Sequence, residues 1–533
     1  MKPNETIPIV VGVTGHRAIR PEDESALLAS VKAELTALRD RCPHTPLKLL
    51  CSLAEGGDLI CARAAEELGI SILAALPMEY REYVKDFTPE GKKRLDGYIA
   101  GAEQVFVTPA TEVVPEETDR DFLFRQAGIY VVIHSHVLLA LWDGGEGTPH
   151  ACGTAEAVDF ALQGSYQPAS GSILPACRGE TVIHIFTPRG DRVEERAGAV
   201  HRLGDGEALE DILQKTEEYN TLAAASAPKK RALLPSDRPE DVILDRLEGC
   251  YRASSVLSAN FAKVYRRSLA LLAAASTILT LAFLLYDEAE AIWMIFVCGA
   301  MLAGAWFCKW YASRSACHRR YIEYRALAEC CRVQAFLRYA GSPLQAADLF
   351  SWTQQEETAW ILNALRILTI GLPPKETRDI RECWVGDQER YHKKAAVDTR
   401  HKSEGSDRVV KIALIVSVTL YFAALFFELS AGGMLTRPFL HVGDPEHYRT
   451  FLKIAMGGLS AATLFISNYY GRMSLPRKLS DHDKMARFYA RMGEQLTLSG
   501  QTEALLSLLA REELIENGNW CSYQRDNSPD ISV

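Results

Sequence analysis

Three glycine-rich turns carry the residues with the clearest capacity for chemistry. They are "GVTGHR" at residues 12–17, "AEGGD" at residues 54–58 and "DGGEGTPHACGT" at residues 143–154. Glycine lets backbone N–H groups approach an oxyanion closely, and a helix that follows adds the positive end of its dipole. Arg17 adds a charged fork that suits phosphate oxygens. The turns therefore predict a phosphate-binding site, with ordinary tight turns between strands and helices as the alternative.

The first turn matches neither of the common nucleotide-binding loops. "GVTGHR" lacks the third glycine of the dinucleotide fingerprint and is not a Walker A loop. His16 beside Arg17 either contacts a phosphate or caps the turn. The other reactive residue types do not form sites. "HSH" at residues 134–136 has two histidines but no third ligand, and the thirteen cysteines form no CxxC pair. Near the proposed site, no local basic partner marks Cys51, Cys61 or Cys152 as a nucleophile. We expect no metal and no nucleophilic cysteine.

The elements around these turns alternate between strand and helix patterns. Apolar strand patterns occur at residues 7–15, 47–54, 71–77, 102–109, 134–144 and 180–190, and amphipathic helix patterns cover residues 23–42 and 56–69. This alternation predicts an α/β domain with a doubly wound, parallel, Rossmann-like sheet. Ligands bind such sheets at the carboxyl ends of the strands, and the three glycine turns follow the first, second and fifth strands.

Composition limits the class of protein. The chain has 533 residues, too many for one core, and a net charge of −9, which does not favour a nucleic-acid partner. The segment "MKPNETIPIV" lacks a long apolar region and a cleavage site, so we expect no secretory signal. The scattered cysteines are expected to be reduced, as in a cytosolic environment.

Four uncharged apolar runs in the second half have the length of membrane spans. They cover residues 268–286, 291–308, 412–427 and 454–471. Lysine and arginine flank the outer ends of each pair, whereas Asp287, Glu288 and Glu290 fill the first connecting turn. By the positive-inside rule, the expectation is a multi-pass protein of the inner (plasma) membrane with cytoplasmic N- and C-termini. Four buried core helices are the alternative.

The residue types within these spans indicate whether the protein could transport protons and how its helices could assemble. They contain no Asp, Glu, Lys or Arg, which argues against a proton-coupled transporter. Small residues allow helices to approach closely, which predicts a homo-oligomer, although packing within one chain explains them equally well. Such residues in the fourth run are Gly457, Gly458, Ser460, Ala461 and Ala462.

The N-terminal half resembles the SLOG superfamily of Rossmann-like domains that bind nucleotides or nucleotide-derived ligands. The resemblance covers about residues 7–190 and rests on "GVTGHR", "AEGGDLICARAAEELG", "RQAGIYVVIHSHVLLALWDG" and "CGTAEAV". It implies ligand contacts from the three turns and from two residues ahead of the fifth strand, one of which, Arg125, has a solvated surface arginine as its alternative. The implied residues are Gly12, Thr14, Gly15, Arg17, Ala54, Glu55, Gly56, Gly57, Asp58, Arg125, Tyr130, Asp143, Gly144, Gly153 and Thr154.

The second half resembles tandem SLATT modules, which are paired-helix membrane effectors linked to nucleotide signals in bacterial conflict. "YIEYRALAECCRVQAFLRYAG" and "LLAREELIENGNWCSYQRD" carry this resemblance. It implies a SLOG-like domain at residues 1–200, a helical linker at 201–267, modules at 268–395 and 396–525, and a tail at 526–533. The ligand is then ADP-ribose-like, NAD-derived or a cyclic nucleotide, the other partners are the lipid bilayer and a separate signal-producing enzyme, and nothing indicates a firm cofactor.

One departure from the SLOG pattern bears on catalysis. The related phosphoribohydrolases place a glutamate three residues after the threonine of their glycine loop, whereas here Ala157 occupies that place and Glu156 lies two residues after Thr154. This favours a ligand sensor coupled to a membrane pore or channel, in a setting of antiviral defence. The alternative is a membrane-tethered nucleotide hydrolase in which Glu55 supplies the carboxylate.

Overall fold

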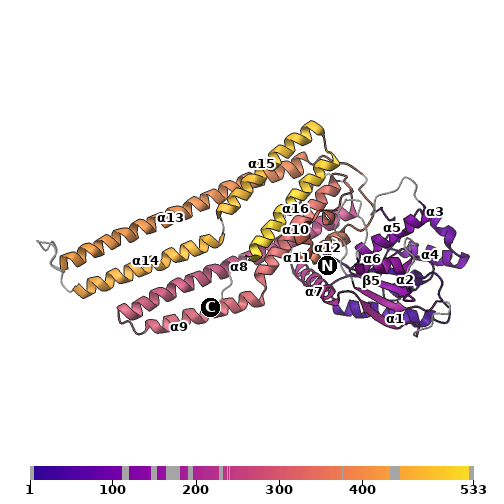
Figure 1. Ribbon diagram of the computed structural model, residues 1–533, viewed down its shortest axis with the longest axis horizontal. Coiled ribbons are helices and arrows are strands. Elements are labelled where there is room, and N and C mark those ends of the chain that lie inside the picture. Colours follow the sequence, from indigo (N-terminus) through magenta and orange to yellow (C-terminus); the bar gives the residue numbers. More distant parts are fainter. Residues whose placement is uncertain are drawn as a thin grey trace. The chain divides into compact units, whose positions relative to one another are not determined.

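The computed structural model describes residues 5–110, 119–145, 153–163, 181–189, 196–226, 232–236, 238, 240–374, 376–431, 445–473 and 475–526. The chain forms two compact units. The first unit comprises Met1–Leu257, Glu323–Ile380 and Gln501–Cys521, and the second comprises Ser258–Ile322, Arg381–Gly500 and Ser522–Val533. Figure 1 shows the sheet of the first unit and the long helices that follow it in the chain.

A seven-stranded sheet forms the centre of the first unit, with the strand order β4-β3-β2-β1-β5-β6-β7. All neighbouring strands are parallel except the pair β6 and β7. The predicted α/β class and the six predicted strands are therefore confirmed, and the short edge strand β7 was not predicted. The strands are β1 Ile9–Gly15, β2 Leu47–Cys51, β3 Ser71–Leu76, β4 Gln104–Val107, β5 Val137–Trp142, β6 Val182–Phe186 and β7 Val200–Leu203.

Two hydrophobic cores cover the two faces of this sheet. Along β1, Val11 packs in one core and Val10 in the other, because successive side chains of a strand point to opposite faces. Helices α1 Glu24–Arg41, α2 Gly57–Glu67 and α4 Pro89–Gly101 contribute to the first core. Helices α5 Arg120–Ile133, α6 Thr154–Gln163 and α12 Ala359–Leu368 contribute to the second. Helices on both faces make the sheet doubly wound.

The strand order creates a switch point between β1 and β5. From β1 the chain first builds outward through β2, β3 and β4, and then returns to place β5 on the other side of β1. The connections after β1 and β5 therefore leave toward opposite faces, which is the place where doubly wound sheets commonly bind their ligands. Two short elements, α3 Tyr80–Tyr83 and the 3₁₀ turn η2 Val84–Asp86, follow β3 at the same edge.

The helices after the sheet divide between the two units. Helix α7 Gly206–Ala225 is tied to the sheet domain by Asn220, whose side chain accepts a hydrogen bond from Ile7 N (3.0 Å) and donates one to Ile7 O (2.9 Å). Helix α8 Val242–Glu288 continues without a break from the first unit into the second. The others are α9 Met294–Arg314, α10 Cys317–Tyr339, α11 Trp352–Glu357, α13 Asp387–Ala431, α14 Pro445–Met473, α15 Leu475–Ser499 and α16 Glu503–Asp526.

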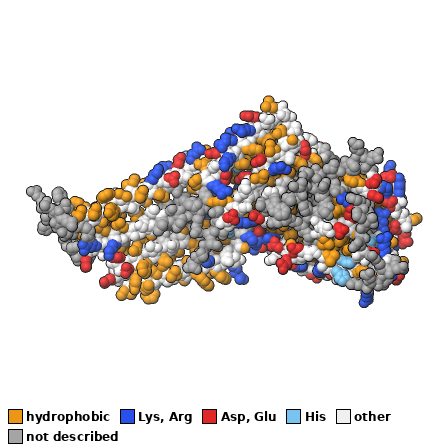
Figure 2. All heavy atoms as spheres, viewed as in Figure 1, with side chains coloured by type: hydrophobic (Ala, Val, Ile, Leu, Met, Phe, Trp, Pro, Cys, Tyr) orange, Lys and Arg blue, Asp and Glu red, His pale blue; other side chains and the backbone are white. Residues whose placement is uncertain are grey.

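Three helices in the described part of the chain are long and apolar enough to cross a membrane, the pattern of an integral membrane protein. They lie within Val242–Glu288, Met294–Tyr339 and Arg381–Phe427, and only 6% of the apolar window of each is buried. Hydrophobic side chains gather on the exposed surface of these long helices, as Figure 2 shows. Since exposed apolar faces of this length are unfavourable in water, a lipid environment explains them.

Aromatic residues mark both ends of the apolar part of α9. Trp293 caps its start and is 61% exposed, and Trp310 is 46% exposed near its end. At the helical rise of 1.5 Å per residue their separation is roughly 26 Å, close to the thickness of a hydrocarbon core. Trp and Tyr side chains favour the interface between lipid and water. The helix begins at Met294, three residues after the start of the predicted span, and residues 291–293 lie outside it.

The fourth predicted span, residues 454–471, lies in helix α14. Its side chains from residue 464 to 474 are outside the described residues, and α14 is not among the three helices above. A count of four spans therefore stays a prediction.

Candidate functional site

The first two glycine turns interlock at the carboxyl edge of the sheet. Gly57 N donates a hydrogen bond to His16 O (2.9 Å), and His16 N donates one to Leu141 O at the end of β5 (3.0 Å). A Cβ atom on Gly15 would lie 2.9 Å from the Cα of Gly57. The two glycines thus let the end of β1 and the start of α2 touch through their backbones.

Gly56 needs to be glycine for two reasons. Its φ of +97° lies in the region that L-residues rarely adopt, and a Cβ there would lie 2.3 Å from Arg17 O. The turn after β2 therefore packs directly on the turn after β1.

His16 joins β1 to β5 across the switch point. Its Nε2 lies 3.1 Å from both the backbone N and the Oδ1 of Asp143. Burial lowers the pKa of His16, and the Asp143 carboxylate partly offsets that effect. Asp143 Oδ1 also accepts a hydrogen bond from Gly145 N (3.0 Å), and Gly144 between them has a φ of +73°. The described start of the third predicted turn, residues 143–145, therefore lies against the first turn.

Asp58, in the first turn of α2, is a buried carboxyl group at this edge. It is 5% exposed and its Oδ2 accepts a hydrogen bond from Ala54 N (3.2 Å). Burial raises the pKa of Asp58 to about 7, although backbone hydrogen bonds and the charge of Arg17 oppose the shift. The group thus titrates near neutral pH.

This shift predicts how stability depends on pH. The folded chain holds the Asp58 proton up to about pH 7, whereas an unfolded chain releases it near 3.8, so this group destabilises the fold increasingly as pH rises between these values. Asp58→Asn removes the effect, and its stability gain over the wild type should be about 3 kcal/mol larger at pH 8 than at pH 5. Denaturant unfolding of the full chain in detergent measures this difference, and parallel pH profiles would contradict it.

Arg17 lies over an aromatic ring beside a second arginine. Its guanidinium carbon is 4.8 Å from the centre of the Phe124 ring, and that of Arg120 is 5.9 Å from the same centre. Both arginines also approach one oxygen of Asp86, with Arg17 Nη1 at 3.9 Å and Arg120 Nη2 at 2.6 Å from Oδ2. Asp86 follows β3, and Arg120 and Phe124 follow β4. Five neighbouring strands therefore contribute to this edge.

Tyr83 adds a buried polar group to the same region. The residue is fully buried, and its hydroxyl has no hydrogen-bond partner among the described residues. Its ring lies 5.0 Å from that of Phe87 and 6.1 Å from that of Phe124. Desolvation raises the pKa of Tyr83, and the charges of Asp58 and Arg17 also act on it. A buried hydroxyl donor therefore lies near these charges, and no described residue accepts a hydrogen bond from it.

Arg125 contacts α6, the helix that follows β5. Arg125 Nη1 pairs with Glu156, and its guanidinium lies 4.7 Å from the centre of the Phe160 ring. Both charged side chains are largely buried, so Arg125 is not a solvated surface arginine. Thr154 begins α6 and is buried, and Gly153 O accepts a hydrogen bond from Ala157 N (3.2 Å). Residues 146–152 of the predicted third turn are outside the described residues.

Four predicted site residues have other contacts. Tyr130 is buried in the second core, and its hydroxyl accepts a hydrogen bond from Gly371 N (3.1 Å). Gly12 lies within β1, where a Cβ would be 2.5 Å from the hydroxyl of Ser135. Glu55 accepts hydrogen bonds from the backbone and the hydroxyl of Thr88, the N-cap of α4. Thr14 is paired with Ala140 in the sheet.

Four residues at the site were missed from the sequence: Tyr83, Asp86, Arg120 and Phe124. The turns after the third and fourth strands have no glycine signature, so only the position of these residues after a strand was informative. In the described part of the chain, no cluster of three or more His, Cys, Asp or Glu residues is suited to a metal ion.

The fold and this edge define a class: an α/β domain of the nucleotide-binding, doubly wound type, joined to helices of membrane-spanning length. Comparison with known proteins does not define this class more closely, because no family model and no curated protein matches the chain.

Proposed function

We propose that this chain is a membrane receptor and effector, in which the edge of the sheet binds a nucleotide-derived ligand and the long helices change the permeability of the bilayer. The observation that carries the proposal is the continuity of α8. Its first turns belong to the unit that contains the sheet, and the same helix continues into a membrane-length apolar segment. A ligand that favours one packing of the first unit can thereby bias the membrane segment.

The ligand class follows from the chemistry of the edge. Two arginines, an aromatic ring and the interlocked turns suit a molecule with phosphate and a flat ring, such as ADP-ribose, NAD or a cyclic nucleotide. We do not propose hydrolysis, because the hydrogen bonds from Thr88 occupy the carboxylate of Glu55. A role in antiviral defence, with a separate enzyme that makes the signal, follows from the SLOG and SLATT resemblance.

The membrane part of the proposal is a pore made by several copies. The described helices offer few polar groups for a channel within one chain, and the small residues of the fourth run suit close packing between helices. The termini and the sheet domain lie on the cytoplasmic side, as the distribution of Lys and Arg around the spans favours.

A binding panel tests the ligand half. The full chain in detergent is heated with ADP-ribose, NAD⁺ and a cyclic dinucleotide, and chromatography then examines each compound. A rise in unfolding temperature with unchanged compound supports a sensor. Cleavage of the compound, or no shift with any of them, would contradict the proposal.

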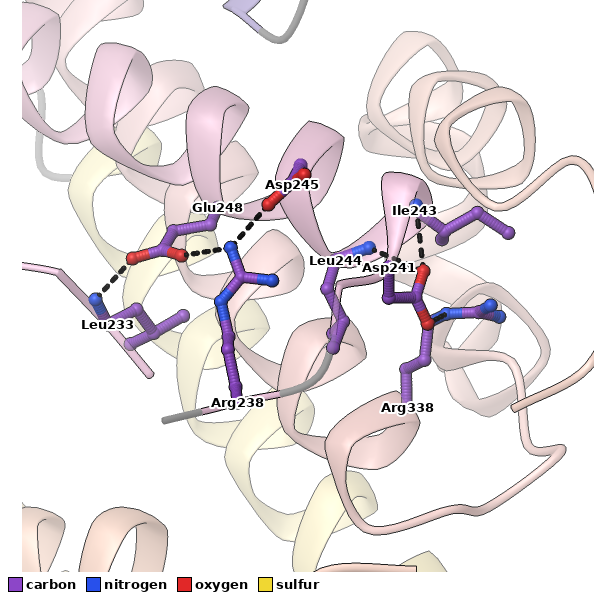
Figure 3. Close-up of polar contacts among 8 residues, drawn as sticks. All are labelled: Leu233, Arg238, Asp241, Ile243, Leu244, Asp245, Glu248 and Arg338. Carbon is purple, nitrogen blue, oxygen red and sulfur yellow. Dashed lines mark hydrogen bonds and ion pairs between the residues drawn. The ribbon is translucent and has the colours of Figure 1, made fainter. Parts of the chain in front are cut away.

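Two polar clusters anchor the start of α8, as Figure 3 shows. Asp241 accepts hydrogen bonds from Ile243 N (2.9 Å), Leu244 N (3.2 Å) and Arg338 Nε (2.7 Å). Further along, Arg238 pairs with Asp245 and Glu248, whose other oxygen accepts a bond from Leu233 N (2.7 Å). These contacts all lie in the first unit and fix the first two turns of the helix.

Loss of this anchor should uncouple binding from permeability. Asp241→Ala removes the cap and leaves Arg338 without its carboxylate, so we expect ligand affinity within twofold of the wild type but about tenfold less ligand-induced dye release. Glu376→Ala, which removes a carboxylate paired with Arg378 outside α8, is the matched control. Equal release by Asp241→Ala and the wild type would show that this cap does not transmit the signal.

A further inference from the structure

The strongest unexplained feature of the edge is the arrangement around Asp86. Two guanidinium groups approach a single oxygen of this carboxylate, and both lie within 6 Å of the centre of one Phe124 ring. Arg17 and Arg120 come from different strand ends, so local sequence does not force them together. Two positive charges that converge on one oxyanion form the kind of group that recognises phosphate.

We propose that the Asp86 carboxylate occupies an anion subsite in the free protein, and that a diphosphate group of the ligand displaces it to bind Arg17 and Arg120. The inference rests on the proposed function and deepens it, because it selects ligands with a diphosphate, such as ADP-ribose or a nucleoside diphosphate. One carboxylate neutralises only one of the two arginines. A diphosphate supplies a second negative charge and more oxygens for the two forks.

The surroundings of the pair agree with an exchangeable anion. Arg17 is 49% exposed and Asp86 24% exposed, so solvent reaches both groups, and the Arg17 contact with Asp86 is long at 3.9 Å. Arg120 lies 4.0 Å from a second acid, Glu82, whose carboxylate also pairs with Lys85. Asp86 is therefore the acid that approaches both arginines. Its removal leaves Arg120 with the weaker contacts to Glu82, whose backbone O is 3.5 Å and whose carboxylate is 4.0 Å from Nη1.

The hydroxyl of Tyr83 is an independent observation that points to a ligand. It is a fully buried donor without a partner among the described residues, and the charges of Arg17 and Asp86 act on it. A buried hydroxyl without an acceptor is unfavourable. An oxyanion bound beside Arg17 is the type of hydrogen-bond acceptor that the Tyr83 hydroxyl lacks.

If a diphosphate displaces Asp86, then removal of the acid and removal of Arg120 should have opposite effects on affinity for the anion. Inorganic pyrophosphate is the probe, and calorimetry with the full chain in detergent is the measurement. Asp86→Asn and Asp86→Ala should each bind pyrophosphate about tenfold more tightly than the wild type, because the competing carboxylate is gone. Arg120→Ala should bind it at least tenfold more weakly. Two replacements of Asp86 keep the test valid if one of them destabilises the turn.

Asp96→Asn is the matched control for net charge. Asp96 is exposed on α4 and accepts a hydrogen bond from Tyr80, so its loss changes the charge of the domain without contact to either arginine. Its pyrophosphate affinity should stay within twofold of the wild type. If Asp96→Asn gained as much pyrophosphate affinity as the Asp86 variants, the effect would come from net charge and the inference would be wrong.

Two further results separate this inference from the proposed function. If ADP-ribose binds the wild type but neither Asp86 variant binds pyrophosphate more tightly, the exchange is wrong and the receptor proposal stands. If the wild type binds none of the nucleotides and no pyrophosphate, both are wrong.

Discussion

Arg17→Ala is expected to weaken the binding of ADP-ribose about 100-fold. The guanidinium of Arg17 is half exposed over the Phe124 ring at the carboxyl edge, where it can donate two charge-assisted hydrogen bonds to a phosphate. Each such bond contributes about 1.5–3 kcal/mol, so the loss of two bonds at the lower end of this range corresponds to a factor of somewhat more than 100. Calorimetry with the full chain in detergent measures the affinity.

The same substitution should leave the fold intact. Arg17 has one long ion pair at 3.9 Å and a cation–π contact, and neither is a large contribution to stability at a half-exposed position. Unfolding temperatures of the variant and the wild type should agree within a few degrees without ligand. Arg39→Ala, which removes an exposed arginine at the end of α1, should change neither property. Loss of affinity in both variants would point to net charge rather than to the site.

Gly15→Val should be among the most damaging single changes at the edge, with a loss of about 3 kcal/mol in the free energy of unfolding. A Cβ at this position would lie 2.9 Å from Gly57 Cα and 3.3 Å from Leu141 Cβ, and backbone atoms there cannot rotate away. The clash must separate β1 from α2 or bend the central strand, and overpacking of this kind commonly costs 1–3 kcal/mol even for flexible neighbours. Denaturant unfolding of the full chain measures the loss.

Gly97→Ala is the matched control for a glycine substitution. Gly97 lies inside α4 and a Cβ there meets no atom within 4 Å. Alanine should therefore stabilise the helix by up to about 1 kcal/mol. If Gly15→Val were as stable as the wild type, the interlocked packing of the two turns would be wrong.

Much of the α/β domain was predictable because strand alternation is a local property. Six strands and the two named helices were found from apolar periodicity alone. The exception is β7, whose four residues are mostly exposed, so its pairing with β6 leaves no apolar pattern.

The site was only partly predictable because its second half depends on the strand order. Arg17, His16, Asp58 and Asp143 lie in glycine turns, which have a sequence pattern. Asp86 and Arg120 resemble ordinary charged surface residues of helices, and only the order β4-β3-β2-β1-β5 brings them beside Arg17. Their convergence is therefore a tertiary property.

Some residues that were predicted to contact the ligand instead support the packing of the α/β domain. Gly12 permits the close approach of Ser135, and the hydroxyl of Tyr130 binds the backbone of Gly371, just after α12. A glycine in a strand and a tyrosine in an amphipathic helix suit either role, so the residue type alone does not distinguish them. The apolar runs were the clearest part of the second half, since length and the lack of charge are sufficient to predict a span.

Dye release from liposomes tests the central claim that the sheet edge controls the membrane helices. Full-length wild type and Arg17→Ala are reconstituted with a trapped fluorescent dye, and ADP-ribose is then added outside to protein whose sheet domain is accessible. We predict release that rises with ADP-ribose for the wild type and stays at the background level for Arg17→Ala. Binding of ADP-ribose without release from the wild type, or equal release from both proteins, would contradict the claim.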